Sequence, residues 1–225
     1  MIWRKLERIM ITVANVVVGA LSVNCYAVYC SETKKGIVID PGSNLNKIIT
    51  MIESTGIKLE AVVLTHSHFD HSVHAVDIKN KYNVPIVLYE KEAELLKSPD
   101  LNLSTSFTNK PISFIADILV KDGDEIIFGN EKLKVMYTPG HTEGSMSLYA
   151  DGMVFSGDTL FAGTHGRTDF PTGDRLSLAL SLKKLFQLPE NTKVYPGHNV
   201  FTTIGAEKTG NFMANALIES IPLDY

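Results

Sequence analysis

The stretch "THSHFDHSVH", residues 65–74, contains four of the seven histidines of the chain. In an extended loop the side chains of His66 and His68 point to the same side, because side chains alternate with a period of two. Both could therefore bind one metal ion. Asp70 and His71 come where the chain turns into a helix, and they could reach a second ion beside the first. Imidazole nitrogens and carboxylate oxygens are ligands that a borderline divalent metal prefers, so the stretch predicts a metal site.

Three further candidate ligands follow apolar, strand-like runs elsewhere in the chain. His141 ends "TPGH", His198 ends "YPGH", and Asp158 follows "GMVFSG". If these strands end at one edge of a sheet, positions far apart in the sequence converge there. Any single histidine would more readily be an ordinary surface or core residue, but the whole pattern favours one metal centre. Its candidate ligands are His66, His68, Asp70, His71, His141, Asp158 and His198.

Short apolar runs alternate with helix-like segments along the chain. Strands are predicted at residues 36–40, 60–65, 84–89, 132–138, 152–156 and 192–198. Helices are predicted at residues 44–55, 70–82 and 174–188. The polar segment 98–114 predicts either a surface loop or a lid over a site. This mixture predicts a layered α/β fold in a single domain spanning residues 1–225.

Residues 1–25 allow two interpretations. Basic residues, then an apolar run and a cysteine, mimic a signal peptide. Against this, Glu7 adds an acid before the run, Asn15 and Gly19 interrupt it, and Asn24 stands where a cleavage site prefers a small residue. The β-branched residues instead favour a pair of strands that turns near Gly19.

The composition limits the possible partners and compartments. The formal net charge of −4 gives no electrostatic footprint for nucleic acid or for an anionic membrane, so neither is an expected partner. The two cysteines, Cys25 and Cys30, would point to opposite faces of a strand and could not form a bridge. We therefore expect reduced thiols in a cytoplasmic protein.

Four segments together resemble the metallo-β-lactamase-fold hydrolases. They are "THSHFDH" (65–71), "TPGHTEGSMSLY" (138–149), "FSGDTLF" (155–161) and "YPGHN" (195–199). The resemblance covers nearly the whole chain, and "GDTLFAGTHGRTDFPTGD" (157–174) is most similar to the short, single-domain, glyoxalase II-like bacterial group. It implies a four-layer αββα sandwich.

The resemblance also implies how the ligands divide between two divalent ions. One ion would be held by His66, His68 and His141. The other would be held by Asp70, His71 and His198, with Asp158 between the two. Zinc is the expected metal, although iron and manganese accept the same ligands.

Three residues near these motifs are not expected to be ligands. His74 stands where the family usually has glycine or alanine, and we interpret it as packed or solvated, with an outer-shell role as the alternative. His165 follows the Gly-Asp strand near the expected substrate mouth, and contact with the substrate is its minority interpretation. Arg167 could bind a substrate carboxylate through two hydrogen bonds, or it could pair with Asp169 or Asp174.

The resemblance implies hydrolysis of a small-molecule thioester, such as a hydroxyacyl-thiol conjugate. A hydroxide bridging two ions would attack the carbonyl, because metal coordination lowers the pKa of water from about 15.7 to about 7. Asp70 would hold the second ion and orient the hydroxide. Glyoxalase II also carries a C-terminal helical region that helps to hold glutathione, and only residues 199–225 follow His198 here. Glutathione is therefore not assured as the thiol.

Other reactions fit the same motifs. A persulfide dioxygenase, an oxidoreductase that holds one iron with two histidines and an aspartate, is similar here, including at "GRTDF" (166–170). Hydrolysis of a lactone, a β-lactam or a phosphodiester is a further alternative. A binding module without enzymatic activity is the least favoured, because a complete ligand set has little purpose without chemistry.

Overall fold

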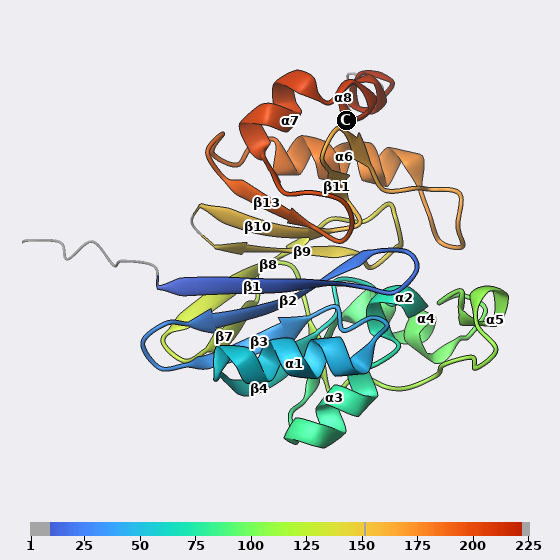
Figure 1. The fold of residues 1–225 in the computed structure, drawn as a ribbon. Helices are drawn as coiled ribbons and strands as arrows, with labels where there is room; N and C mark the ends of the chain where they lie inside the picture. The colour runs from blue at the N-terminus through green and yellow to red at the C-terminus, as the bar shows by residue number, and fades with distance from the viewer. Residues whose placement is uncertain (1–9, 151, 222–225) are drawn as a thin grey trace, which may run out of the picture.

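Two six-stranded β-sheets pack face to face between outer layers of helices in the computed structural model, which describes residues 10–150 and 152–221 (Figure 1). The first sheet has the order β1-β2-β3-β4-β5-β6. Its strands are β1 (Ile11–Val18), β2 (Val23–Cys30), β3 (Lys35–Ile39), β4 (Lys58–Val63), β5 (Ile86–Tyr89) and β6 (Ile118–Val120). Strands β3 to β6 run parallel to one another.

The second sheet has the order β14-β13-β10-β9-β8-β7. Its strands are β7 (Glu125–Phe128), β8 (Glu131–Tyr137), β9 (Met146–Ala150), β10 (Met153–Gly157), β13 (Lys193–Pro196) and β14 (Thr202–Thr203). Strand β10 pairs with β13 in parallel, and β11 (Leu160–Phe161) with β12 (Thr164–His165) forms a small separate ribbon.

The helices cover the outer faces of the sheets and the end where the strands run out. They are α1 (Leu45–Thr55), α2 (Phe69–Ser72), α3 (Ala75–Tyr82), the 3-10 helix η1 (Glu90–Glu92), α4 (Ala93–Lys97), α5 (Ser104–Phe107), α6 (Arg175–Leu185), α7 (Ile204–Gly210) and α8 (Phe212–Glu219). Helices α1 and α3 lie below the first sheet in Figure 1, and α6 to α8 lie above the second. Among the described residues, every helix is too short or too polar to span a bilayer.

Three apolar layers hold these four layers of structure together, which confirms the predicted αββα sandwich. Ile48 and Ile78 pack under the first sheet, Val63 and Phe155 pack between the sheets, and Leu178 packs above the second. Strands buried on both faces read as continuous apolar runs rather than alternating ones, as "GIVI" in β3 does.

The predicted strand pair at the N-terminal end is present. Strands β1 and β2 are antiparallel with Val18 opposite Val23, so the chain turns at residues 19–22. Both cysteines of β2 are buried and free. Residues 1–9, which hold the basic start of the alternative targeting segment, lie outside the described residues.

The prediction of a single helix at residues 70–82 is wrong in one respect, because the segment forms two helices, α2 and α3. The backbone N–H of His74 donates to the carbonyl of Pro41 at 3.1 Å, instead of continuing the helix. Gly42 lies so close that a Cβ atom there would be 1.9 Å from the Asp70 carbonyl oxygen. Contact with the turn after β3 therefore breaks the helix and fixes Asp70 and His71 on their own short turn.

Candidate metal centre

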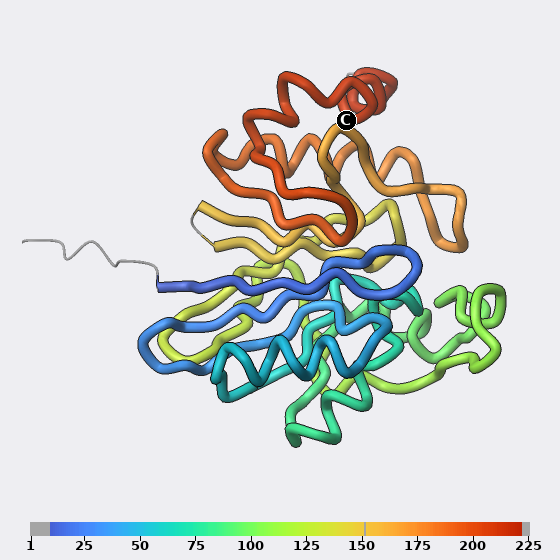
Figure 2. Tube along the Cα trace, viewed as in Figure 1, coloured from blue at the N-terminus to red at the C-terminus, as the bar shows by residue number. Residues whose placement is uncertain are grey.

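The candidate ligands lie at the carboxyl ends of strands from both sheets. The stretch 65–71 follows β4 in the first sheet, whereas His141, Asp158 and His198 follow β8, β10 and β13 in the second. The chain path in Figure 2 brings the β1–β2 hairpin beside the segment after β13, where Val23 forms an isolated bridge with His198. The face-to-face packing of the sheets therefore assembles the cluster.

The first ligand group consists of three buried histidines. His66 Nε2 lies 3.1 Å from His68 Nδ1, and His141 Nε2 lies 2.9 Å from the same atom. His66, His68 and His141 can each direct one nitrogen at a common point. The structure thus brings together the three residues that were predicted to share one ion.

The second ligand group consists of Asp70, His71 and His198. His71 Nε2 lies 3.2 Å from His198 Nε2, and Asp70 Oδ2 lies 3.6 Å from each of these nitrogens. The side chain of His71 is fully buried, whereas those of Asp70 and His198 are partly exposed. This group is therefore more exposed to solvent than the first.

Asp158 faces both groups. Its Oδ1 lies 3.5 Å from His71 Nε2, while its Oδ2 lies 3.3 Å from His198 Nε2 and 3.5 Å from His141 Nε2. The backbone of Gly197 approaches so closely that a Cβ atom there would be 2.1 Å from Asp158 Oδ1. A larger residue at this position of "YPGH" would therefore push the Asp158 carboxylate and the His71 ring out of place.

The outer nitrogen of four of these histidines faces an oxygen, which orients each ring. His66 Nδ1 lies 3.1 Å from Thr65 Oγ1, His71 Nδ1 3.0 Å from Asp40 Oδ2, His141 Nδ1 2.8 Å from the Arg167 carbonyl, and His198 Nδ1 2.9 Å from the Leu21 carbonyl. An outer hydrogen bond of this kind fixes the tautomer and leaves the inner nitrogen free to bind a metal.

The donor set fits a pair of divalent ions. Four histidine Nε2 atoms and His68 Nδ1 point inward at one another, and only a cation or a proton can satisfy lone pairs that converge in this way. Asp158 Oδ1 is also buried and has no hydrogen-bond partner among the described residues. Nitrogen and carboxylate oxygen, without a thiolate, suit zinc, iron or manganese.

Asp40 and Glu92 support the ligands, and the sequence analysis did not identify either. Asp40, at the end of β3, accepts hydrogen bonds from the Thr65 backbone N–H at 2.8 Å and from the Thr65 hydroxyl at 2.7 Å. Glu92 follows β5 and accepts a hydrogen bond from the Ser67 backbone N–H at 2.7 Å. Both follow parallel strands of the first sheet, so the strand-end rule that selected Asp158 could have found them.

The remaining histidines stand apart from both groups. His74 Nδ1 pairs with Asp77 Oδ2 at 2.7 Å on the surface, and His165 Nδ1 donates to the carbonyl of Gly166 at 2.8 Å. Arg167 makes two hydrogen bonds to Asp169, at 2.9 and 2.6 Å, with both side chains exposed. The pairing alternative for Arg167 is thus the arrangement present in this structure.

The two groups differ in protonation when no metal is bound. Burial, together with the neighbouring imidazoles, lowers the pKa values of His66 and His68 well below their usual value, so both are neutral. Burial opposes a charge on His71 as well, but Asp158 and Asp70 outweigh it and raise the pKa of His71 to about 10. Burial also opposes a charge on His198, whose pKa is nevertheless raised by Asp158.

Filling the second group is therefore expected to release the protons held by His71 and His198, whereas His66 and His68 are already neutral. A histidine must lose its proton to bind a metal, so affinity at Asp70, His71 and His198 is expected to rise with pH up to about 10, the pKa of His71. Calorimetric titration of metal-free protein with Zn²⁺, in buffers with different ionisation enthalpies, measures the protons released. Equal proton release at both binding steps would contradict this prediction.

Comparison with known proteins gives consistent results. Residues 18–198 match the family model of the metallo-beta-lactamase superfamily. The probable metallo-hydrolase YqgX of Bacillus subtilis is 34% identical over 206 residues, which cover 88% of this chain and 95% of that protein. The hydroxyacylglutathione hydrolase GloC of Haemophilus influenzae is 33% identical over 205 residues, which cover 88% and 96%.

Solved structures are similar over most of the chain. BLEG-1 B3 metallo-beta-lactamase has a TM-score of 0.84 and 36% identity, covering 89% of this chain and 98% of that one. TTHA1623 in a di-iron-bound form has a TM-score of 0.80 and 33% identity, covering 88% and 98%. ETHE1 from Myxococcus xanthus has a TM-score of 0.76 and 27% identity, covering 94% and 92%.

Proposed function

This chain belongs to the metallo-β-lactamase superfamily as a metallo-hydrolase, and we propose that its substrate is a small-molecule thioester. The observation that carries the proposal is the pair of adjacent ligand groups with Asp158 facing both. The similarity to GloC, whose name specifies a hydroxyacylglutathione, supports a thioester in particular. The di-iron form of TTHA1623 supports the use of two ions.

We propose that His66, His68 and His141 hold one divalent ion and that Asp70, His71 and His198 hold the other, with Asp158 between them. Bound ions of this kind polarise a carbonyl oxygen and lower the pKa of water to about 7. The assignment of individual ligands rests on the distances between their nitrogen and oxygen atoms.

The protein residues have distinct roles in this proposal. Asp70 is the partly exposed carboxylate of the cluster, so it can orient the attacking water and accept a proton from it. Buried His71 donates from Nδ1 to Asp40, which keeps its Nε2 aimed at the cluster. The thiolate is a good leaving group and needs little help from an acid, so no further catalytic side chain is required.

Arg167 and His165 remain the candidates for contact with the substrate. Arg167 lies over the ring of Phe170, with its guanidinium carbon 4.3 Å from the ring centre, and Phe170 also lies edge-on to His68. The loop from Gly166 to Phe170 therefore borders the first ligand group. In this proposal a substrate carboxylate displaces Asp169 from Arg167 in order to bind there.

Metal analysis combined with activity assays tests the proposal. We expect two divalent ions in each chain and hydrolysis of thioesters, measured as thiol released from S-lactoylglutathione and from neutral acyl thioesters. One iron for each chain, together with oxygen consumption on a persulfide, would instead support the dioxygenase alternative. Hydrolysis of a lactone, a β-lactam or a phosphodiester, without turnover of any thioester, would place the substrate in another class.

We further propose that the reaction takes place in the cytoplasm. Cys25 and Cys30 lie on the same strand, β2, and both are buried as free thiols. Proteins of reducing compartments commonly keep such cysteines unpaired. Fractionation of the native host cells, with detection of the untagged protein, tests this location.

A further inference from the structure

We propose that a pocket beside Asp70 binds an uncharged, apolar group of the substrate. This inference rests on the proposed thioester hydrolysis and specifies the substrate class within it. The preferred thioester would carry a short alkyl or aromatic group close to the reacting carbonyl. A peptide-like arm with several charges would be a poor occupant of this pocket.

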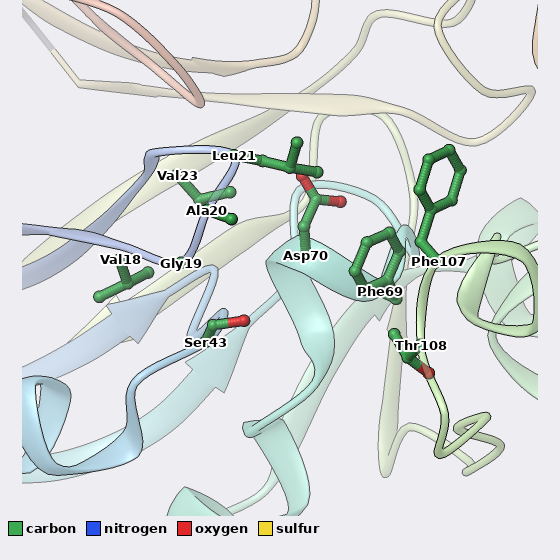
Figure 3. A pocket seen from close by; sticks show the side chains of 10 residues that line it. All are labelled: Val18, Gly19, Ala20, Leu21, Val23, Ser43, Phe69, Asp70, Phe107 and Thr108. Atoms are coloured by element: carbon green, nitrogen blue, oxygen red, sulfur yellow. The ribbon is translucent and has the colours of Figure 1, made fainter.

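The pocket has a volume of about 320 Å³ and opens beside the second ligand group. The turn of the β1–β2 hairpin, with Ala20 and Leu21, forms one wall, and Phe69 and Phe107 form the other. Figure 3 shows the side chain of Asp70 between these two walls. This volume is near the lower limit of ligand pockets, about 300–1,000 Å³, so it suits one small group rather than a long conjugate.

The hairpin wall is held against a proposed metal ligand. The Leu21 carbonyl accepts the hydrogen bond from His198 Nδ1 at 2.9 Å, and the Gly19 backbone N–H donates to Asn44 Oδ1 at 2.8 Å. Leu21 itself is 51% exposed. An apolar side chain is thereby fixed beside the reacting centre without being buried by the protein itself.

The aromatic wall joins the segment after β4 to residues 98–114, the segment that was predicted to be either a surface loop or a lid. The rings of Phe69 and Phe107 are stacked, with centres 5.6 Å apart and planes inclined by 10°. The Phe69 backbone N–H donates to the carbonyl of Asn102 at 2.9 Å, which ties the two segments together. Phe107 is nevertheless 56% exposed, so much of its ring remains available to a ligand.

The charges around the pocket favour an uncharged occupant. Among the described residues that line it, Asp70 is the one ionisable side chain, and no lysine or arginine is present. The glutathione moiety carries two carboxylates, and carboxylates are usually bound by arginine or lysine. Contiguous exposed apolar side chains are found at ligand-binding grooves as well as at interaction surfaces. The pocket thus favours alkyl or aryl groups over glutathione.

Two series of thioesters test the inference and show which arm of the substrate enters the pocket. In one series acetyl, butyryl and hexanoyl groups are attached to N-acetylcysteamine. In the other series an acetyl group is attached to ethanethiol, butanethiol and hexanethiol. We expect kcat/KM to rise about threefold for each methylene in one series, until the pocket is full. A flat response in both series would overturn the inference.

The variant Phe107→Ala tests whether the pocket causes the preference for longer alkyl chains. The gain for each methylene is expected to fall to below about twofold in this variant. Ile127→Ala is the matched control, because Ile127 is an exposed apolar residue on β7, away from the pocket. It should keep the preference of the unchanged protein. An unaltered chain-length dependence in Phe107→Ala would contradict the assignment.

A binding measurement separates failure of this inference from failure of the proposed function. S-hexyl-N-acetylcysteamine is a thioether that cannot be hydrolysed, and its binding to the protein can be measured by calorimetry. We expect binding that weakens about tenfold in Phe107→Ala. Absence of binding would refute the pocket, even if thioesters are hydrolysed. Binding without turnover of any thioester would instead refute the proposed reaction and leave the pocket in place.

Discussion

Replacing His68 with alanine is expected to remove the metal from the first ligand group and to reduce turnover of thioesters by more than about 100-fold. Nδ1 of His68 lies between the inner nitrogens of the other two ligands, 3.1 Å from His66 Nε2 and 2.9 Å from His141 Nε2. The loss should exceed the roughly 10- to 100-fold cost of losing an outer hydrogen-bond partner, because a direct ligand disappears. Metal content and kcat/KM measure the two effects.

His74→Ala is the matched control for this variant. His74 comes from the same stretch of sequence, but its ring pairs with Asp77 on the surface and lies outside both ligand groups. Its removal should leave the metal content unchanged and kcat/KM within about twofold, as for most surface substitutions. If His68→Ala kept its metal and its activity, the proposed metal centre would be refuted. If His74→Ala lost them, His74 would have to be reassigned as a ligand.

Replacing Glu92 with alanine is expected to lower both the stability of the protein and its affinity for metal. Glu92 is fully buried, and its carboxylate accepts hydrogen bonds from the Ser67 N–H at 2.7 Å, the Gly144 N–H at 3.0 Å and the Thr142 hydroxyl. Ser67 stands between His66 and His68, and Thr142 follows His141. A single carboxylate therefore connects the two loops that supply the first ligand group.

The size of the effect follows from the donors that lose their acceptor. Each buried donor left without a partner costs about 1–3 kcal/mol, so we expect the free energy of unfolding of Glu92→Ala to fall by roughly 3 kcal/mol or more. Chemical denaturation of the metal-free protein measures this loss. Competition with a chelator measures the affinity for metal, which should fall by about tenfold or more as the two loops lose their common anchor.

Two further variants distinguish a positioning role from a general loss of stability. Glu94→Ala removes a neighbouring carboxylate that is 79% exposed and paired with Lys97, and it should change neither property appreciably. Glu92→Gln keeps the shape of the side chain and one acceptor oxygen, so it should recover part of the metal affinity. If Glu92→Ala lowered the stability but left the metal affinity unchanged, Glu92 would have a structural role only, and its role in positioning the ligands would be contradicted.

The sequence predicted the architecture well where hydrophobic periodicity and strand ends coincide. The runs at residues 36–40 and 60–65 are buried on both faces in β3 and β4, and such strands have a clear apolar pattern. The helix predicted at residues 70–82 was only partly right, because a hydrogen bond from His74 to Pro41 breaks it, and a local pattern contains no information on that contact. That residues 1–225 form a single domain remains a prediction.

The candidate site also has one part that local sequence predicts, the ligands, and one part that depends on contacts between distant segments, the groups that orient them. The aspartates and histidines of the cluster carry a recognisable spacing, and the structure places all seven candidates together. The carbonyls of Leu21 and Arg167, which orient His198 and His141, are backbone groups that any residue could provide. Glu92 resembles the other acids of "EKEAE", and only its burial distinguishes it. The two carbonyls become visible only when the packing of the two sheets is known, whereas the end of β5 already points to the segment that holds Glu92.

The distribution of the ligands over both sheets also sets an order of assembly during synthesis. The three histidines of the first group have all been made once residue 141 has been added, whereas the second group stays incomplete until His198 emerges, 127 positions after His71. Domains fold as their chain leaves the ribosome, at about 5–20 residues per second. A nascent chain thus contains all three histidines of the first group for several seconds before the second group is complete.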